Sequence, residues 1–379
     1  MKILIAPDKF KGVSTAQEIS QLMRNLIQKC VPQAQLRLCP MADGGEGTLN
    51  SIIYMLKGKT LSATVFDPLM RAKQVQFGMA QLPEKDTALI EMAQASGLFR
   101  LAPEERNPME TTTYGTGELV LEAIKHGAVH IKIALGGSAT VDGGLGFLHA
   151  LGAIPKSKTT LPKGLTGKHL DSILSLDLEP AIQKLKGISI TGLVDVHVPL
   201  LGDHGAARMF GPQKGATPEM VETLEKGLYH FEEVLAKSSG YLLKNNPGAG
   251  SAGGLGMAIL ALGGRLESGF KFISQNLKLE DQMKGCDLVI TGEGKLDASS
   301  REGKVPISVA RVAKKAGVPC YAIVGALDVN GEWYKEEGIV RVFPLFDSAF
   351  VENDARKELF QQKMADTINM IFSKKTVNT

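Results

Sequence analysis

The sequence predicts an α/β protein built on a parallel sheet, and two observations lead to this prediction. Strand-like and helix-like patterns alternate near both ends of the chain, and glycine-rich segments follow several of the strand-like runs. Such alternation is typical of βαβ units, in which each helix returns the chain so that the next strand can pair in parallel. The length of 379 residues, with 44% hydrophobic content, suggests two domains.

The N-terminal elements are the clearest. The apolar run "KILIAP" (2–7) reads as a strand, and residues 15–29 carry apolar side chains at helical spacing. Thr15 and Glu18 have the spacing of a capping box at the start of this helix. A second strand, "LRLCPM" (36–41), precedes another helix-like run. The segment between them, "ADGGEGT", is therefore predicted to be a βα loop.

The C-terminal end repeats this pattern. The strand "CDLVIT" (286–291) is followed by a polar loop, by a helix from Pro306 to Gly317 and by the strand "CYAIVG" (320–325). We expect these elements to join the N-terminal ones in one sheet.

The middle of the chain has a different pattern. Residues 62–93 contain short β-rich runs separated by turn signals, which favours antiparallel pairing. We therefore predict a discontinuous domain formed by 1–60 and 285–379, interrupted by an inserted α/β domain at 61–284. The clearest elements of the insert would be strands at 129–135 and 188–196 and a helix after Thr217.

Composition narrows the class of function. The net charge of +3 arises from 43 basic and 40 acidic side chains that are well mixed, so neither nucleic acid nor an anionic membrane is an expected partner. The N-terminus lacks the pattern of a signal peptide, and no apolar stretch reaches the length of a membrane span. The balanced charge instead favours action on small molecules. Four cysteines far apart predict reduced core thiols and a cytoplasmic protein.

Four glycine-rich segments are candidates for ligand binding: 42–47, 136–146, 248–256 and 291–297. Glycine lets backbone N–H groups approach an anion at a helix N-terminus, and phosphate is the ligand that we expect first. Acids and lysines accompany these segments, a mixture that Mg²⁺-dependent phosphoryl transfer requires. They are Asp8, Asp43, Glu46, Asp142, Asp195, Glu293, Asp297, Lys9, Lys11, Lys214, Lys295 and Lys304.

Other interpretations compete with phosphate binding. Any single glycine-rich segment is equally well explained as a tight turn or a helix cap. The stretch "GAGSAG" (248–253) matches GxGxxG, but residues 241–247 before it do not read as the strand that a dinucleotide fold needs. The motifs of P-loop enzymes, protein kinases and GxSxG hydrolases are absent from the sequence.

Eight blocks in a fixed order carry a resemblance to a known family. They are "APDKFKG" (6–12), "PMADGGEGT" (40–48), "TTTYGTGEL" (111–119), "GGSATVDGG" (136–144), "DVHVPLLG" (195–202), "GPQKGA" (211–216), "GAGSAGGLG" (248–256) and "TGEGKLD…GKVP" (291–306). The chain resembles the bacterial glycerate kinases along nearly its whole length.

The resemblance implies ATP-dependent phosphorylation of D-glycerate with Mg²⁺. It also implies a Rossmann-like, flavodoxin-type domain interrupted by a second α/β domain, with the active site in the cleft between them. Formation of 2-phosphoglycerate is favoured, and 3-phosphoglycerate stays possible. Two alternatives remain open: an NAD-dependent dehydrogenase on a similar scaffold, and a nucleotide-binding sensor without catalytic activity. The chain gives no signal for oligomeric state.

Roles for individual residues follow from this expectation. Asp43 and Glu46 are the candidate metal ligands, and Asp195 is the favoured catalytic base, with Asp43 as the alternative. Lys9, Lys11 and Lys214, followed by Arg71, are candidates for binding phosphate or the glycerate carboxylate. The remaining candidates for substrate or phosphate binding are Gly136, Gly137, Ser138, Gly250, Gly253, Gly254, Glu293 and Lys295.

Overall fold

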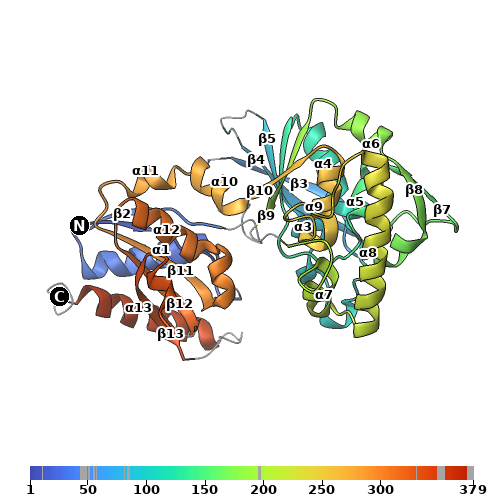
Figure 1. The fold of residues 1–379 in the computed structure, drawn as a ribbon. Coiled ribbons are helices and arrows are strands. Elements are labelled where there is room, and N and C mark those ends of the chain that lie inside the picture. The colour runs from blue at the N-terminus through green and yellow to red at the C-terminus, as the bar shows by residue number, and fades with distance from the viewer. Residues whose placement is uncertain are drawn as a thin grey trace. The chain divides into compact units, whose positions relative to one another are not determined.

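The computed structural model describes residues 1–10, 12–42, 49, 52–53, 56, 58–80, 82, 86–194, 198–329, 331–347 and 355–373. The chain forms two compact units (Figure 1). The first comprises residues 1–43, 50–55 and 270–379, and the second comprises 44–49 and 56–269. The chain thus returns to the first unit at 270, earlier than the boundary at 285 drawn from the sequence.

The first unit contains a five-stranded parallel sheet. Its strand order is β2-β1-β11-β12-β13, so the N-terminal and C-terminal segments pair directly through β1 and β11. This corresponds to the order 2-1-3-4-5 of flavodoxin-type folds, and it confirms the predicted fold class. The strands are β1 (Lys2–Ile5), β2 (Gln35–Leu38), β11 (Leu288–Asp297), β12 (Cys320–Asp328) and β13 (Ile339–Phe346).

The start of the first helix in this unit is determined by its local sequence. Helix α1 (Ala16–Cys30) begins at the predicted capping box: Thr15 Oγ1 accepts from the Glu18 N–H at 3.2 Å, and Glu18 Oε2 accepts from the Thr15 N–H at 2.9 Å. Its apolar face is buried in a core shared with β1, β11 and α13 (Ala355–Phe372). Phe10 and Phe360 meet edge to face in this core, with ring centroids 5.2 Å apart.

The remaining helical elements of this unit lie before β11, between β11 and β12, and between β12 and β13. Helix α12 (Val305–Lys315) packs against β11 and β12. The others are α10 (Gly269–Asn276), which starts at the boundary between the units, α11 (Leu279–Met283), and the short 3₁₀ turns η5 (Ala298–Glu302) and η6 (Trp333–Lys335).

One predicted loop is a strand. Residues 291–297, "TGEGKLD", were expected to form a glycine-rich loop, but β11 continues through them to Asp297 and pairs with β12. The physical reason is close strand approach: a Cβ atom at residue 292 would lie 2.2 Å from the carbonyl oxygen of Ile323. Glycine is therefore needed at position 292 because the two strands pair closely, and not because the chain turns there.

The second unit contains a six-stranded mixed sheet in the order β10-β9-β6-β5-β4-β3. β5 (Thr87–Glu91), β6 (His130–Ala134), β9 (Ser189–Val194) and β10 (Arg265–Ser268) are parallel neighbours. β3 (Lys59–Phe66) and β4 (Ala72–Ala80) add to the edge in antiparallel fashion, which confirms the pairing predicted for residues 62–93.

Helices surround a large apolar core in this unit. The longest, α8 (Pro218–Ser239), starts where predicted, with Thr217 Oγ1 accepting from the Met220 N–H at 3.3 Å. Further α-helices among the described residues are α3 (Met92–Ser96), α4 (Tyr114–Lys125), α5 (Leu145–Leu151), α6 (Glu179–Lys184), α7 (Ala206–Phe210) and α9 (Ser251–Ala261). The 3₁₀ turns are η1 (Leu98–Arg100), η2 (Pro103–Glu105), η3 (Gly167–Ser172) and η4 (Pro212–Lys214), and β7 (Ile154–Ser157) pairs with β8 (Ile173–Asp177) in antiparallel fashion.

The cysteines agree with the sequence prediction of unpaired thiols. All four are free, and Cys39, Cys286 and Cys320 are buried. None of the helices in the described part of the chain has the length and apolarity that crossing a bilayer requires.

Candidate functional site

Several predicted site residues lie outside the described residues: Lys11, Asp43, Glu46 and Asp195. The others fall on both units. The first carries Lys9, Glu293 and Lys295. The second carries Arg71, Gly136, Gly137, Ser138, Lys214, Gly250, Gly253 and Gly254.

The first unit gathers polar residues at the carboxyl end of β1 and at the neighbouring residues in the middle of β11. Asp8 and Lys9 follow β1, and the Asp8 N–H donates to the carbonyl of Gly292 at 2.8 Å. Glu293 is 6% exposed and accepts a 2.9 Å hydrogen bond from Ser300 Oγ. The strand order reverses between β1 and β11, and this is the point at which doubly wound sheets bind ligands. Asp8 and Glu293 therefore lie at the edge where a ligand is expected.

A pocket of about 490 Å³ lies farther along this edge, at the ends of β11 and β12. Lys295 Nζ lies 2.7 Å from a carboxylate oxygen of Asp328 and 4.0 Å from one of Asp297. The hydrogen bond from Lys295 to Asp328 raises the pKa of the lysine. Lys304 Nζ approaches Asp297 at 3.5 Å. The predicted Lys295 thus lines a charged pocket, and its partners are carboxylates of the neighbouring strand ends.

In the second unit, the loop 136–146 after β6 is organised around Asp142. This side chain is fully buried and accepts from the N–H and the hydroxyl of Thr113, at 2.8 and 2.7 Å. The N–H groups of Gly144 and Gly146 also donate to it. Burial raises the pKa of Asp142, and these four hydrogen bonds oppose that rise. Asp142 joins the loop to the segment 111–119, so its observed role is structural.

Lys214 is the most distinctive cation of this unit. It is 3% exposed, and its Nζ donates to Ser138 Oγ and to the carbonyl oxygen of Thr140, each at 2.8 Å. Both partners are neutral. Burial lowers the pKa of Lys214 to about 7, and the charge of Asp142 opposes that change. Two predicted residues, Ser138 and Lys214, are therefore in direct contact.

The predicted glycines of 248–256 serve packing. Gly253 has φ of +69°, and a Cβ atom there would lie 2.0 Å from the carbonyl oxygen of Thr140. The N–H of Gly143 donates to the Gly253 carbonyl at 2.9 Å, and Gly254 faces Gly143 as well. Gly250 packs on Pro199. These glycines bring two glycine-rich segments into backbone contact, which explains their presence without a ligand.

The arginines of the second unit differ in their pairing. Arg71, a predicted binding residue, donates from Nε to Asp67 and from Nη1 to Glu105, each at 2.6 Å. Arg106 was not singled out from the sequence. Its Nε atom is buried and has no hydrogen-bond partner among the described residues. The main chain of Arg106 packs directly on Gly215, because a Cβ atom there would lie 2.1 Å from the Arg106 carbonyl oxygen.

Arg106 could not have been identified from its position in the sequence. The triplet "RNP" precedes the block "TTTYGTGEL", and Gly215 follows Lys214 in the block "GPQKGA". Nothing in the residue pattern itself indicates that these two blocks meet. The signal is therefore visible only after folding.

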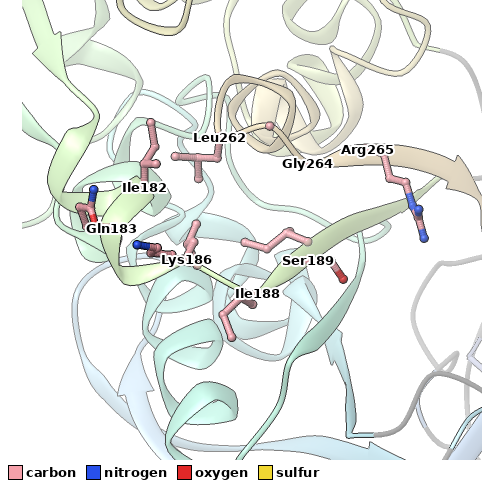
Figure 2. Close-up of a pocket in the computed structure, with 11 residues that line it drawn as sticks. Ile182, Gln183, Lys186, Ile188, Ser189, Leu262, Gly264 and Arg265 are labelled. Carbon is pink, nitrogen blue, oxygen red and sulfur yellow. The ribbon is translucent and has the colours of Figure 1, made fainter.

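The second unit contains another pocket, of about 530 Å³, at the amino ends of β9 and β10 (Figure 2). It is lined by Ser189 at the start of β9 and by Arg265 at the start of β10, together with Ile182, Lys186 and Leu262. The loop 136–146 follows the carboxyl end of β6, which runs parallel to β9. This pocket is therefore distinct from the predicted site.

Comparison with known proteins identifies the family. The model of the glycerate kinase family matches residues 3–374. The chain belongs to the glycerate kinase family. It is 40% identical to a glycerate kinase of Haemophilus influenzae over 371 residues, covering 98% of each chain. It is 42% identical to a glycerate 2-kinase of Escherichia coli, covering 92% of this chain and 91% of that one.

A solved structure supports the fold of this family member. A protein of Salmonella typhimurium assigned as glycerate kinase 2 superposes with a TM-score of 0.83 at 35% identity, covering 100% of this chain and 99% of that one. The chain is thus a kinase by family. Among the described residues no group of three or more His, Cys, Asp or Glu side chains could bind a metal ion, and both predicted metal ligands lie outside them.

Proposed function

We propose that this chain phosphorylates D-glycerate with ATP and Mg²⁺, and that its product is 2-phosphoglycerate. The name of the Escherichia coli relative, a glycerate 2-kinase, supports phosphorylation of the 2-hydroxyl. The family match over residues 3–374 supports the substrate class. Residues of both units would take part, since the predicted site residues are divided between them.

The observation that carries this proposal is the buried lysine at position 214. Its Nζ donates only to two neutral oxygen atoms within the described residues, which leaves one of its three N–H donors for a ligand. A buried cation without a direct anionic partner favours binding of an anionic group. Arg106, whose Nε is buried without a partner, packs against the residue after Lys214. We assign these two side chains to the carboxylate of glycerate.

The residues at the carboxyl edge of the first unit fit a magnesium nucleotide. Mg²⁺ prefers oxygen ligands and usually keeps several waters, and the carboxylates of Asp8 and Glu293 are of this kind. Asp43 and Glu46, the predicted metal ligands, follow β2 in the sequence. When bound, Mg²⁺ would neutralise charge on the phosphates. Lys9 would contribute positive charge beside them, and Lys295 lies farther along the same edge, paired with Asp328.

The catalytic base is proposed to be Asp195, which follows the last residue of β9 in the sequence. A carboxylate accepts the hydroxyl proton late in a loose transition state, so its position matters more than a raised pKa. Asp43 is the alternative.

The dehydrogenase alternative is disfavoured by the context of GxGxxG. Residues 241–247 form turns rather than a strand, and Gly253 contacts the backbone of Thr140. A dinucleotide site needs a strand directly before the glycines. The motif therefore lacks the surroundings in which it binds a pyrophosphate.

An assay of ADP release tests the proposal. The purified chain should release ADP from ATP and Mg²⁺ with D-glycerate, and much more slowly with glycerol, which lacks the carboxylate. Coupling the product directly to enolase distinguishes the hydroxyls, because enolase consumes 2-phosphoglycerate and not the 3-isomer. Nucleotide binding without ADP release would favour the sensor, and NADH formation from NAD would favour the dehydrogenase.

A further inference from the structure

The pocket at the ends of β11 and β12 has the size and lining of a nucleoside site. Its volume of about 490 Å³ falls within the range of small-molecule sites. Trp333 and Arg301 form one wall, and Lys295, Asp297 and Asp328 carry the charges around it. All of these residues belong to the first unit.

The aromatic wall is suited to a planar base. Trp333 is half-buried, and the guanidinium carbon of Arg301 lies 4.8 Å from the centroid of its ring. Indole rings and guanidinium planes are the surfaces on which nucleobases stack. Trp333 is also the sole tryptophan of the chain.

The polar wall is suited to a ribose. The carboxylates of Asp328 and Asp297 end β12 and β11, and a carboxylate at a strand end accepts hydrogen bonds from ribose hydroxyls in dinucleotide folds. Lys295, between them, neutralises one of these charges at 2.7 Å from Asp328. The two positive and two negative side chains of the lining give it no net charge, which suits an uncharged nucleoside.

We propose that this pocket binds the base and ribose of the ATP used by the reaction, with the adenine against Trp333 and Arg301. This rests on the proposed function. β11 lies between β12 and β1 in the sheet, so Asp8, Lys9 and Glu293 lie on the β1 side of this pocket, and we place the phosphates there. Helix α12 begins after β11 with Lys304 at its N-cap position, and the N-terminus of a helix favours anions.

Tryptophan fluorescence tests the proposal directly, because the single tryptophan makes the signal specific to this pocket. Adenosine, ADP and ATP should each change the emission of Trp333 in a saturable manner. Tripolyphosphate, which lacks the base and ribose, should bind without this change. If adenosine and ATP compete for the same change in Trp333 emission, the base contacts Trp333.

Steady-state kinetics provide the second measurement. Trp333→Ala should raise the KM for ATP roughly 10-fold, since stacking on an aromatic ring is worth about 1–3 kcal/mol per base. The KM for D-glycerate and the melting temperature should change little. Tyr229→Ala is the matched control, because Tyr229 is an exposed aromatic whose ring lies 5.8 Å from Lys244 in the other unit. Its KM for ATP should equal that of the unmodified enzyme.

The outcomes separate this inference from the proposed function. Normal ADP release with constant fluorescence at saturating ATP, and an unchanged KM in Trp333→Ala, would overturn the nucleoside site and leave the kinase intact. Saturable fluorescence changes without ADP release would overturn the kinase and keep the pocket as a nucleotide site. An unfolded Trp333→Ala protein would shift the test to Trp333→Leu and to the fluorescence titrations.

Discussion

Lys214 donates a 2.8 Å hydrogen bond to the hydroxyl of Ser138, and both side chains are buried in the second unit. The same ammonium group donates to the carbonyl oxygen of Thr140, so its direct partners are uncharged. Asp142, held by four other donors, acts on it only at longer range. The loop 136–146 therefore surrounds a cation without neutralising it, an arrangement suited to an anionic ligand.

The first prediction concerns stability against pH. The pKa of Lys214 is about 7 in the folded protein and 10.5 for an ordinary lysine, so between these values the unfolded chain binds the additional proton. Stability therefore rises with pH across this window, by up to about 1.4 kcal/mol per pH unit, and this gain is absent below pH 7. The Lys214→Met variant should lack this rise in stability with pH.

Urea unfolding at several pH values measures this effect. The free energy of unfolding of the unmodified chain, minus that of Lys214→Met, should increase from pH 7 upward and stay level below it. A difference that does not change with pH would show that Lys214 stays charged in the native protein.

The second prediction separates two arginines. Arg106→Met should raise the KM for D-glycerate by about 10- to 100-fold, because hydrogen bonds to charged groups are worth roughly 1.5–3 kcal/mol. Arg71→Met should leave that KM nearly unchanged and lower the stability, because it leaves the carboxylate of Asp67, which is 1% exposed, without its cation. Kinetics and melting temperatures on both variants check this. A raised KM in Arg71→Met alone would reverse the two assignments.

The third prediction concerns the backbone contact between glycine-rich segments. Gly253→Ala should destabilise the protein by more than about 3 kcal/mol, because the new Cβ atom meets the Thr140 carbonyl in addition to the strain of positive φ. Gly263→Ala is the control: its φ is +76°, but nothing lies within 4 Å of the new atom. It should cost only about 1–2 kcal/mol.

Chemical unfolding of both variants compares the two costs. Equal losses would mean that the backbone contact at Thr140 relaxes freely, and that positive φ alone requires glycine at 253.

Sequence reasoning succeeded where the cause of structure is local. The capping box of Thr15 and Glu18, the helix after Thr217 and the individual strands of the first sheet depend on spacing within a few residues. It failed at 291–297, where the need for glycine comes from a neighbouring strand more than twenty residues away in the sequence. No local pattern distinguishes such a glycine from one in a turn.

The site was predictable only in part for the same reason. Charged residues beside glycine pointed to Lys214 and Lys295. The fold places Lys214 against neutral oxygen atoms and Lys295 against a carboxylate. Arg71 was a candidate without a neighbouring glycine, and its partners Asp67 and Glu105 are apparent only after folding. Arg106 gave no signal, because its importance depends on contact with Gly215, which follows a different block.

The last prediction concerns the carboxylates proposed for catalysis and metal binding. Asp195→Asn preserves the size of the side chain and removes the charge that accepts the proton, so turnover should fall by about 10²- to 10⁴-fold with nearly unchanged ATP binding. Asp43→Asn should differ: raised Mg²⁺ should recover part of its activity, because mass action offsets a weakened metal site. Asp171→Asn, at an exposed position of the second unit, serves as the control for a change of charge alone. Turnover, Mg²⁺ dependence and melting temperature should be measured on all three variants. If both carboxylates only cap loops, melting temperatures should fall while the folded enzyme keeps normal turnover, and a folded Asp195→Asn enzyme with normal turnover would remove Asp195 from the reaction.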